Sequence, residues 1–300
     1  GITSFSVKPI RLVFSTGVVV FIVSLLMLLY ALIAALLVIY CFAVLIPVVW
    51  IILSGFKNVK ELYAVPSSFF PKTIDLGKLS RVWTEMKIYK YYINTFIMAG
   101  GATVAACLAG GLAGYSISKL KPKGTGVIFM ILFWIMLMPG TLRTVPLYIG
   151  FKDVPLIHIS LLDTFWPIWI MSASSIFNII LFKNFFDGIS GSIIEAAKID
   201  GASAMRIFAK IVMPLSVPVF VTVAIFTFNG QVGQFFWPYL LIKKKELTVL
   251  GVQMYTMQSS NYTMDYQMLA ILFSILPQLL IFAVFQKKII GGVSVGAVKG

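Results

Sequence analysis

The stretch EAAKIDGASAMRIFAKIVMP, residues 195–214, is the most informative part of this chain. In its spacing, Glu-Ala-Ala is followed by three residues, a glycine, nine residues and then Ile-x-x-Pro. The positions concerned are Glu195, Ala196, Ala197, Gly201, Ile211 and Pro214. The Asp200-Gly201 pair predicts a turn, because both residues favour tight turns and glycine accepts a positive φ. We therefore expect two short helices joined by a turn.

Local sequence signals define where these two helices start. Ser192 followed by Glu195 fits a capping box, in which two side chains satisfy free backbone amides at a helix start. The second helix should start at Ser203 or at the turn itself, and expose three apolar side chains: Met205, Ile207 and Phe208. A helix–turn–helix segment outside the bilayer suits docking into a groove of another protein. The alternative is an ordinary interfacial helix that links two spans.

The composition of the chain is that of a membrane protein. Of its 300 residues, 60% are hydrophobic and only 11% are charged, which leaves too little polar surface to cover a soluble core. Apolar runs long enough to cross roughly 30 Å of hydrocarbon recur along the sequence. We expect an all-α membrane protein with six spans, the third of them broken near Met138-Pro139-Gly140: 27–53, 93–117, 125–149, 162–185, 213–231 and 266–289.

The N-terminal region contains an uncharged run from Leu12 to Leu53, too long for one helix perpendicular to the bilayer. We expect an interfacial or tilted helix over 12–26 that leads into the first span, and two separate spans are the alternative. The predicted organisation is an N-terminal helix segment, a membrane domain and a short C-terminal tail, over residues 1–26, 27–290 and 291–300.

The formal net charge of +14 does not indicate a nucleic-acid-binding protein. Lysine and arginine are scattered among the loops and form no basic stripe interleaved with aromatic residues. We expect them to set the topology and to contact anionic lipid headgroups. They are balanced between the two sides of the predicted topology, so charge alone does not orient the chain.

The 195–214 stretch resembles the EAA loop of permease subunits of ATP-binding-cassette importers, with Met213 in place of the usual leucine. Similarities outside this stretch are Asn94-Thr95, Met138-Pro139 and Pro146-Leu147-Tyr148. The chain is similar to carbohydrate-importer permeases of the maltose type from about Phe42 to its C-terminus. The resemblance implies a type I importer permease fold in which the EAA loop, over 190–214, forms cytoplasmic coupling helices.

The resemblance also implies a set of partners. It predicts a subunit of the bacterial cytoplasmic (inner) membrane that pairs with a second permease subunit as a heterodimer. Two cytosolic ATPase subunits would hold ATP and Mg²⁺, and an extracytoplasmic solute-binding protein would deliver a carbohydrate. The EAA loop and the C-terminus would lie in the cytoplasm, and no nucleic acid is expected. The residues that couple to the ATPase would be Glu195, Ala196, Ala197, Asp200, Gly201, Ile211 and Pro214.

Two further segments gain a role from the resemblance. The family's tail inserts along the ATPase dimer interface, and the corresponding residues are Gly296, Lys299 and Gly300. A frayed terminus is the alternative for this tail. The outer loop over 243–265 corresponds to a loop that reaches into the binding protein, with Tyr255 and Tyr262 as expected contacts because tyrosine gives a large contact area. A solvated cap is the alternative for this loop.

Polar amides within the predicted spans mark a passage for a hydroxyl-rich solute, because such groups are costly at membrane depth unless they face a cavity or a partner helix. The candidates are Asn178, Asn229 and Gln231, with Trp237 able to stack on the face of a sugar. Hydrogen bonding between helices is the alternative for each of them.

Sequence motifs for catalysis are absent. There is no nucleotide-binding G-x-x-x-x-G-K-[ST] motif, no nucleophile–base pair and no metal-ligand spacing around the one histidine, His158. We expect a transport subunit with no catalytic residue, metal or cofactor of its own. An ion-gradient-driven secondary transporter is the alternative, but it requires acidic or histidine relay groups that the span interiors lack. A multispan membrane enzyme or scaffold is a third hypothesis.

Overall fold

The computed structural model describes residues 8–66, 68–259 and 261–297, and all the regular elements in these ranges are helices. The first half contains α1 (Lys8–Phe56), α2 (Val59–Leu62), α3 (Gly77–Glu85), α4 (Ile88–Tyr115), η1 (Ser116–Leu120), α5 (Thr125–Leu137), η2 (Gly140–Arg143), α6 (Thr144–Lys152), α7 (Trp166–Ala173) and α8 (Ile176–Asp187). The second half contains α9 (Gly191–Ile199), α10 (Ala204–Ile207), η3 (Phe208–Val212), α11 (Met213–Leu215), α12 (Val217–Val232), α13 (Phe236–Leu241), η4 (Lys245–Leu247), α14 (Leu250–Thr256), η5 (Met257–Ser259) and α15 (Met264–Ala297). The elements η1 and η3 are π-helical, and η2, η4 and η5 are 3₁₀ helices.

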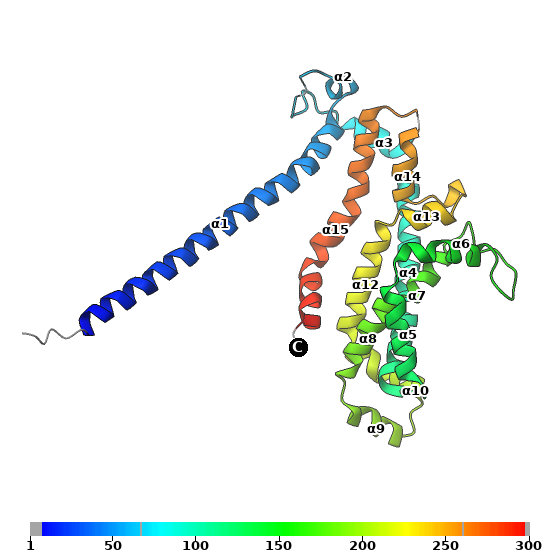
Figure 1. The fold of residues 1–300 in the computed structure, drawn as a ribbon. Coiled ribbons are helices and arrows are strands. Elements are labelled where there is room, and N and C mark those ends of the chain that lie inside the picture. Colours follow the sequence, from blue (N-terminus) through cyan, green and yellow to red (C-terminus); the bar gives the residue numbers. More distant parts are fainter. Residues whose placement is uncertain (1–7, 67, 260, 298–300) are drawn as a thin grey trace, which may run out of the picture.

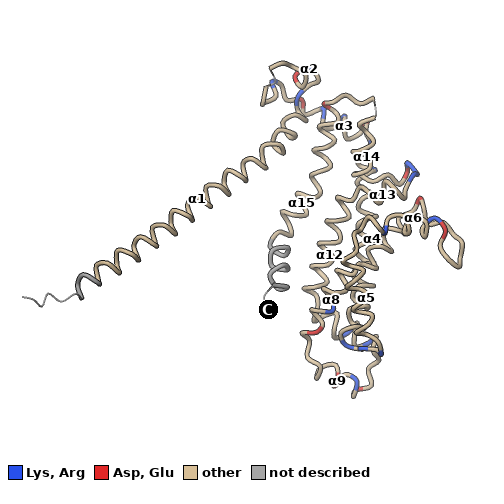
Figure 2. Tube along the Cα trace, in the orientation of Figure 1, with Lys and Arg blue, Asp and Glu red and all other residues tan. Residues whose placement is uncertain are grey.

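The helices form an elongated bundle whose two ends differ (Figure 1). We call the end that carries α2, α3 and α14 the α14 end, and the opposite end, which carries α9 and α10, the α9 end. Charged residues lie at these two ends and around α6 at the side of the bundle, and the long stretches of α4, α12 and α15 between the ends carry none (Figure 2). This distribution is expected of a bundle whose middle lies in hydrocarbon, where a charged side chain is costly.

The predicted number of crossings agrees with the structure. Among the described residues, four segments are long and apolar enough to span a bilayer: Leu12–Phe56, Ile88–Leu120, Trp166–Asp187 and Met264–Gln286. Two bent pairs add to them: Thr125–Leu137 with Gly140–Lys152, and Ala204–Leu215 with Val217–Val232. Counting each bent pair as one span gives up to six crossings.

The break predicted at Met138-Pro139-Gly140 is present and sharp. Helix α5 ends at Leu137, and the next segment departs from it at 105°. The cause is local, because a residue before proline is pushed out of the helical region, and Met138 has an extended ψ of 132°. Helix α6 therefore runs across the bundle axis rather than along it.

Helix α1 is one continuous helix of 49 residues. No turn interrupts it, so the alternative of two separate spans between Leu12 and Leu53 is wrong. From residue 12 to residue 47 all side chains are exposed except Ala34, which is partly exposed, and Figure 1 shows the helix leaving the bundle. The placement of 12–26 at the membrane interface stays a prediction.

The C-terminal end of α1 is held by buried lysines. Nζ of Lys78, on α3, donates to the carbonyl oxygens of Gly55 (3.1 Å) and Lys57 (2.8 Å) and pairs with a carboxylate oxygen of Asp265, on α15 (2.9 Å). Lys57 is only 2% exposed, and its Nζ donates to the Ser68 carbonyl oxygen. Lys57 therefore does not extend its charge into water at the end of α1, although lysines at span ends commonly do so. This anchor, which joins α1, α3 and α15, satisfies two carbonyls at the end of α1.

Helix α4 is the central element, packed against α7, α8 and α12. Its small residues allow this packing, as expected for helices that approach closely in lipid. A Cβ atom added at Gly114 would lie 2.6 Å from Cβ of Phe182 and 3.0 Å from the backbone nitrogen of Lys183. The backbones of α4 and α8 can lie this close only because Gly114 has no side chain.

We predict that Gly114→Ala destabilises the folded chain by about 1–3 kcal/mol, because the added methyl group overpacks a contact that includes backbone atoms. Gly100→Ala is the matched control on the same helix, since a Cβ added there meets no atom within 4 Å. The control should be neutral or slightly stabilising, because alanine favours a helix more than glycine does. Thermal unfolding midpoints of the two purified variants test this prediction, and equal midpoints would contradict it.

Candidate functional site

The 195–214 stretch forms two short helices and a turn, as predicted. The first helix, α9, lies across the α9 end of the bundle, followed by α10 (Figure 1). Between them, Gly201 has a φ of +75°. The Ala202 amide donates to the Ala197 carbonyl and the Gly201 amide donates to the Lys198 carbonyl, both at 3.0 Å, which is the hydrogen-bond pattern of a Schellman motif. The predicted glycine turn is confirmed.

The helix start predicted at Ser192 and Glu195 is wrong. Helix α9 begins at Gly191 with Ser190 as its N-cap residue, and this cap has no side-chain hydrogen bond. Ser192 therefore lies inside the first turn, where its hydroxyl contacts the Ser190 hydroxyl at 2.7 Å instead. The Glu195 carboxylate makes no hydrogen bond or ion pair with the described part of the chain and is exposed.

The second helix is capped as expected but exposes fewer side chains. Ser203 accepts a hydrogen bond from the Arg206 amide and so caps α10. Met205 is 61% exposed, in agreement with the prediction, whereas Ile207 and Phe208 are 1% and 3% exposed. The expectation that these two residues are exposed is wrong, because α10 continues directly into η3, which is packed into the bundle.

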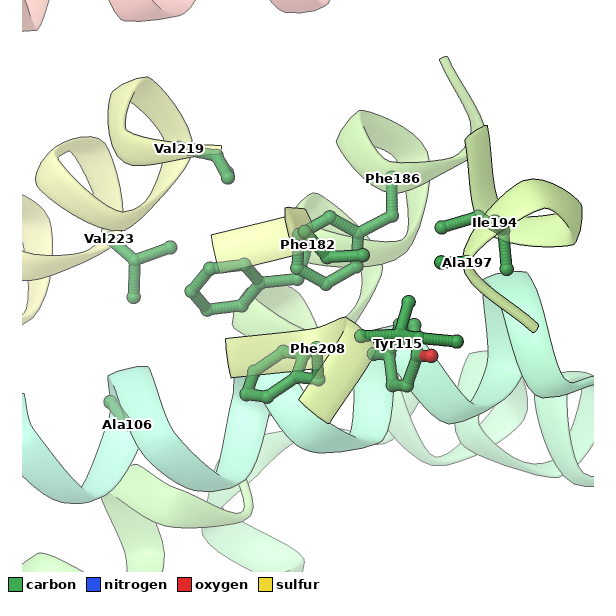
Figure 3. Close-up of a cluster of buried hydrophobic side chains, with 11 residues drawn as sticks. Ala106, Tyr115, Phe182, Phe186, Ile194, Ala197, Phe208, Val219 and Val223 are labelled. Atoms are coloured by element: carbon green, nitrogen blue, oxygen red, sulfur yellow. The ribbon is translucent and has the colours of Figure 1, made fainter. Parts of the chain in front are cut away.

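A buried apolar cluster fixes the two short helices to the bundle (Figure 3). Ile194 and Ala197 on α9 point into it, and they are 3% and 7% exposed. The cluster continues through Phe208, whose ring centroid lies 5.2 Å from that of Tyr115, near the end of α4. The three residues of the Glu-Ala-Ala motif therefore differ: Ala197 is buried against the bundle, whereas Glu195 and Ala196 are exposed.

Polar contacts hold the segment that leads into α9. Asp187, at the end of α8, accepts hydrogen bonds from the Ser118 hydroxyl and the Lys183 ammonium group, both at 2.6 Å. Nζ of Lys119 donates to the Ile189 carbonyl at 2.6 Å. Ser118 and Lys119 belong to the π-helix η1, so the end of α4 and the start of α9 are tied together. No pattern in the sequence predicts this contact, because it joins segments about 70 residues apart.

The remaining predicted positions of the stretch lie where it re-enters the bundle. Ile211 is partly buried and belongs to η3, and Pro214 is exposed in the first turn of α11. Because α10, η3 and α11 follow one another without a break from Ala204 to Leu215, Pro214 lies near the end of this helical stretch and not at the start of a span. Asp200 is the exposed C-cap residue of α9.

The exposed surface of α9 and α10 carries both apolar and charged side chains. Ile193, Ile199 and Met205 are 43%, 87% and 61% exposed, and Glu195 lies on the same two helices. Apolar side chains at water are typical of a surface that contacts another molecule. The α9–α10 element therefore combines a fixed backbone, a buried face attached to the bundle and an exposed face without a partner in the described chain.

A second candidate site is an open pocket of about 360 Å³ among α7, α8, α12 and α13. Three of the four predicted passage residues line it: Asn178, Gln231 and Trp237. The fourth, Asn229, is exposed and does not line the pocket. Gln231 Nε2 donates to the Ser172 hydroxyl at 3.1 Å, and Asn178 Nδ2 to the Thr227 hydroxyl at 3.3 Å.

Ser172, Ser175 and Thr227 also line this pocket but are not among the residues chosen from the sequence. Serine and threonine in a helix commonly bond a carbonyl of the preceding turn, and Ser172 does so with Ile168 at 2.9 Å. The sequence alone therefore does not distinguish a serine or threonine that lines the pocket from one that only bonds a carbonyl of its own helix.

The outer segment over 243–265 is more regular than a loop. It contains η4, α14 and η5, and α14 packs against α4 and α15. Tyr255 is 50% exposed, and its ring centroid lies 4.8 Å from Phe235 and 5.2 Å from Tyr239. Tyr262 is partly buried instead, and its hydroxyl donates to the Glu85 carbonyl at 3.5 Å. Of the two tyrosines, Tyr255 is the one available to a partner.

The tail residues are described only in part. The backbone of α15 continues as a helix to Ala297 and so includes Gly296, while Lys299 and Gly300 lie outside the described residues. Their predicted contact with an ATPase stays a prediction. Within the described residues, no group of three or more His, Cys, Asp or Glu side chains is placed to hold a metal ion.

We predict that the Gly201 turn tolerates alanine poorly and valine still less. A positive φ costs an L-residue roughly 1–2 kcal/mol, and a β-branched side chain resists it further. Hydrogen–deuterium exchange of the 190–214 segment should accelerate in the order wild type, Gly201→Ala, Gly201→Val. Gly191→Ala is the control, because a Cβ there meets no atom within 4 Å and no positive φ is needed. Wild-type exchange in both Gly201 variants would show that the turn does not depend on glycine.

The sequence is similar to those of known transport proteins. The sequence model of a family described as "binding-protein-dependent transport system inner membrane component" matches residues 102–294, which include α9, α10 and the pocket. A relative from Streptomyces coelicolor, the diacetylchitobiose uptake system permease protein NgcG, is 30% identical over 267 residues, covering 87% of this chain and 86% of its own. The arabinooligosaccharides transport system permease protein AraQ of Bacillus subtilis is 28% identical, covering 85% and 91%.

The fold is also similar to solved structures. A chain from the crystal structure of a bacterial ABC transporter involved in the import of the acidic polysaccharide alginate superposes with a TM-score of 0.72 at 24% identity, covering 96% of this chain and 99% of that one. A chain from the alginate ABC transporter in complex with alginate pentasaccharide-bound periplasmic protein gives a TM-score of 0.62 at 15% identity, covering 86% and 92%.

Proposed function

Because the chain belongs to the family of binding-protein-dependent transport system inner membrane components, we propose that it carries a saccharide across the cytoplasmic membrane as one half of a heterodimeric ATP-driven importer. Two ATPase subunits supply the energy and an extracytoplasmic binding protein supplies the saccharide. A saccharide is proposed because curated relatives are named for diacetylchitobiose and arabinooligosaccharides. In this assembly ATP and Mg²⁺ are held by the partner subunits.

The observation that carries this proposal is the geometry of the α9–α10 element. Its exposed face includes a glutamate without any partner in the described chain, and its buried face is attached to α4, α8 and η3. A docked ATPase that moves α9 therefore moves the packed helices with it, since close-packed elements shift as rigid bodies. This is how ATPase closure would reach the pocket, which lies further along α8 and α12.

The orientation follows from the same proposal. If α9 contacts cytosolic ATPases, the α9 end is cytoplasmic and the α14 end faces the binding protein. Helix α15 begins at the α14 end and runs toward the α9 end (Figure 1), and this direction supports a C-terminal tail on the ATPase side, as its proposed role requires. Tyr255 then lies on the side of the binding protein.

An ion-driven secondary transporter has less support. The ranges 93–118, 125–142, 164–182, 211–242 and 266–286 contain no charged residue and no histidine. A transporter that couples to protons or cations through side chains needs such groups within its spans. A charge-free interior instead suits a carrier whose energy comes from another subunit.

We predict that Glu195→Lys abolishes coupling without unfolding the chain. The Glu195 carboxylate makes no bond within the described chain, so its loss leaves the bundle intact, while reversing the charge at a docking face opposes association. In the complex reconstituted in liposomes, saccharide uptake and stimulated ATPase activity should fall by about tenfold or more. Glu85→Lys, an equal charge change at an exposed site of the α14 end, should retain both. Full uptake in an assembled Glu195→Lys complex would refute the coupling role.

Substitution of Tyr255 tests whether the α14 end contacts the binding protein. Replacing this half-exposed ring with alanine should weaken the response of the ATPase to loaded binding protein by roughly tenfold, since exposed tyrosines often dominate interfaces. Tyr255→Phe keeps the ring and should keep most of the response. Basal ATPase activity should be unchanged in both variants, because Tyr255 lies at the end opposite α9. An unchanged response of Tyr255→Ala would remove this residue from the interface.

A further inference from the structure

The pocket among α7, α8, α12 and α13 has an uncharged wall. It measures about 360 Å³, the size of a small-molecule site. None of its lining residues, all of which belong to the described part of the chain, is Asp, Glu, Lys, Arg or His. Amides and hydroxyls supply the polar groups of the wall: Ser172, Ser175, Asn178, Thr227, Gln231 and Gln234.

These polar groups leave hydrogen-bonding capacity unused. Gln231 and Asn178 each donate one hydrogen bond to a hydroxyl group on another helix of the wall. The bond from Gln231 to Ser172 measures 3.1 Å and the bond from Asn178 to Thr227 measures 3.3 Å. A side-chain amide has two N–H donors and a carbonyl acceptor, so both retain further groups. The carbonyl oxygen Oε1 of Gln231 is buried and has no partner among the described residues. A ligand with hydroxyl groups that both donate and accept matches this inventory.

The rest of the wall is apolar and partly aromatic. Trp237, Phe177 and Phe226 line the pocket beside the amides. Sugar rings carry apolar C–H faces between their hydroxyl groups, and an aromatic ring offers such a face a large, flat contact. Apolar walls with a few placed polar groups are the usual composition of a small-molecule site.

The parts of the helices that supply the wall carry no charge either. These segments, 164–182 and 211–242, contain no charged residue. The charged residues of α8, Lys183 and Asp187, follow the segment that lines the pocket. A carboxylate in the pocket would therefore lose water and gain no positive partner, which is strongly unfavourable.

We propose that this pocket binds an uncharged saccharide and disfavours saccharides that carry carboxylates. Gln231 and Asn178 bind hydroxyl groups of the sugar, Ser172 and Thr227 hold the two amides in place, and Trp237 lies against a ring face. This inference rests on the proposed transport of a saccharide and names its chemical class. The proposed selectivity for uncharged saccharides does not depend on the binding protein, because it follows from the residues that line the pocket.

Direct binding to the assembled complex tests the proposal. The permease with its partner subunits, without binding protein, is placed in nanodiscs, and saturation-transfer NMR measures weak binding of each probe both without nucleotide and after trapping with ADP and vanadate. The neutral probes are maltotriose, cellotriose and N,N′-diacetylchitobiose, and the acidic probes are trigalacturonate and trimannuronate. Gln231→Ala and the isosteric Thr227→Val alter the pocket. Thr222→Val is the matched control on α12, since its hydroxyl bonds the Pro218 carbonyl of its own helix at 2.9 Å and does not line the pocket.

At least one neutral probe should bind, and the two pocket variants should weaken its binding about fivefold to tenfold, as expected when a hydrogen-bond partner is removed. Thr222→Val should bind like the wild type, and the acidic probes should bind weakly or not at all. The proposal is overturned if an acidic probe binds as well as the best neutral one, if no neutral probe binds, or if Thr227→Val has no effect. Failure of the coupling proposal would instead appear in the ATPase and uptake measurements on Glu195→Lys, which this binding measurement does not use.

Discussion

The contact between α4 and α8 at Gly114 is the constraint on which the α9 end depends. In lipid, helices gain little from hydrophobic burial against one another, so their association depends on close packing. Gly114 brings the α8 backbone near enough for Phe182 to pack between the helices, stacked on Phe186 with ring centroids 5.6 Å apart. The same apolar cluster includes Ile194 of α9. The position of the α9–α10 element therefore depends on the absence of a side chain at Gly114.

The features predicted correctly from sequence are those with local causes. Gly201 permits its turn through its own backbone, Pro139 ends α5 through its own ring, and long apolar runs identify the crossings. The features that were missed depend on distant partners. Burial of Lys57 follows from its contact with Ser68 beyond the end of α1, and the start of α9 at Gly191 follows from contacts of the preceding segment with η1. The pocket was found only in part, since a hydroxyl such as that of Thr227 becomes a pocket group only when Asn178 lies opposite it.

The distribution of charge links insertion of the chain to its transport chemistry. The chain has a formal net charge of +14, but the long apolar helix segments of the bundle contain no charged residue, and the charges lie where water and headgroups are available. Because these segments lack charged residues, the helices can lie in hydrocarbon. For the same reason, only amides, hydroxyls and aromatic rings are left to contact a solute. Solubility in the membrane and discrimination between solutes thus follow from one property of the sequence.

The buried Lys78 has a mechanical consequence for α1. Among the residues that the structure describes, this helix is held at one end only, by the carbonyl groups that Lys78 binds and by the packing of Gly55 against Leu269. At 1.5 Å per residue its 49 residues make a lever of roughly 70 Å. A rotation of only about 5° at the anchor displaces the free end by roughly 6 Å over that length. A small tilt of α3 and α15 at the anchor would therefore move the free end of α1 much further than the anchor itself.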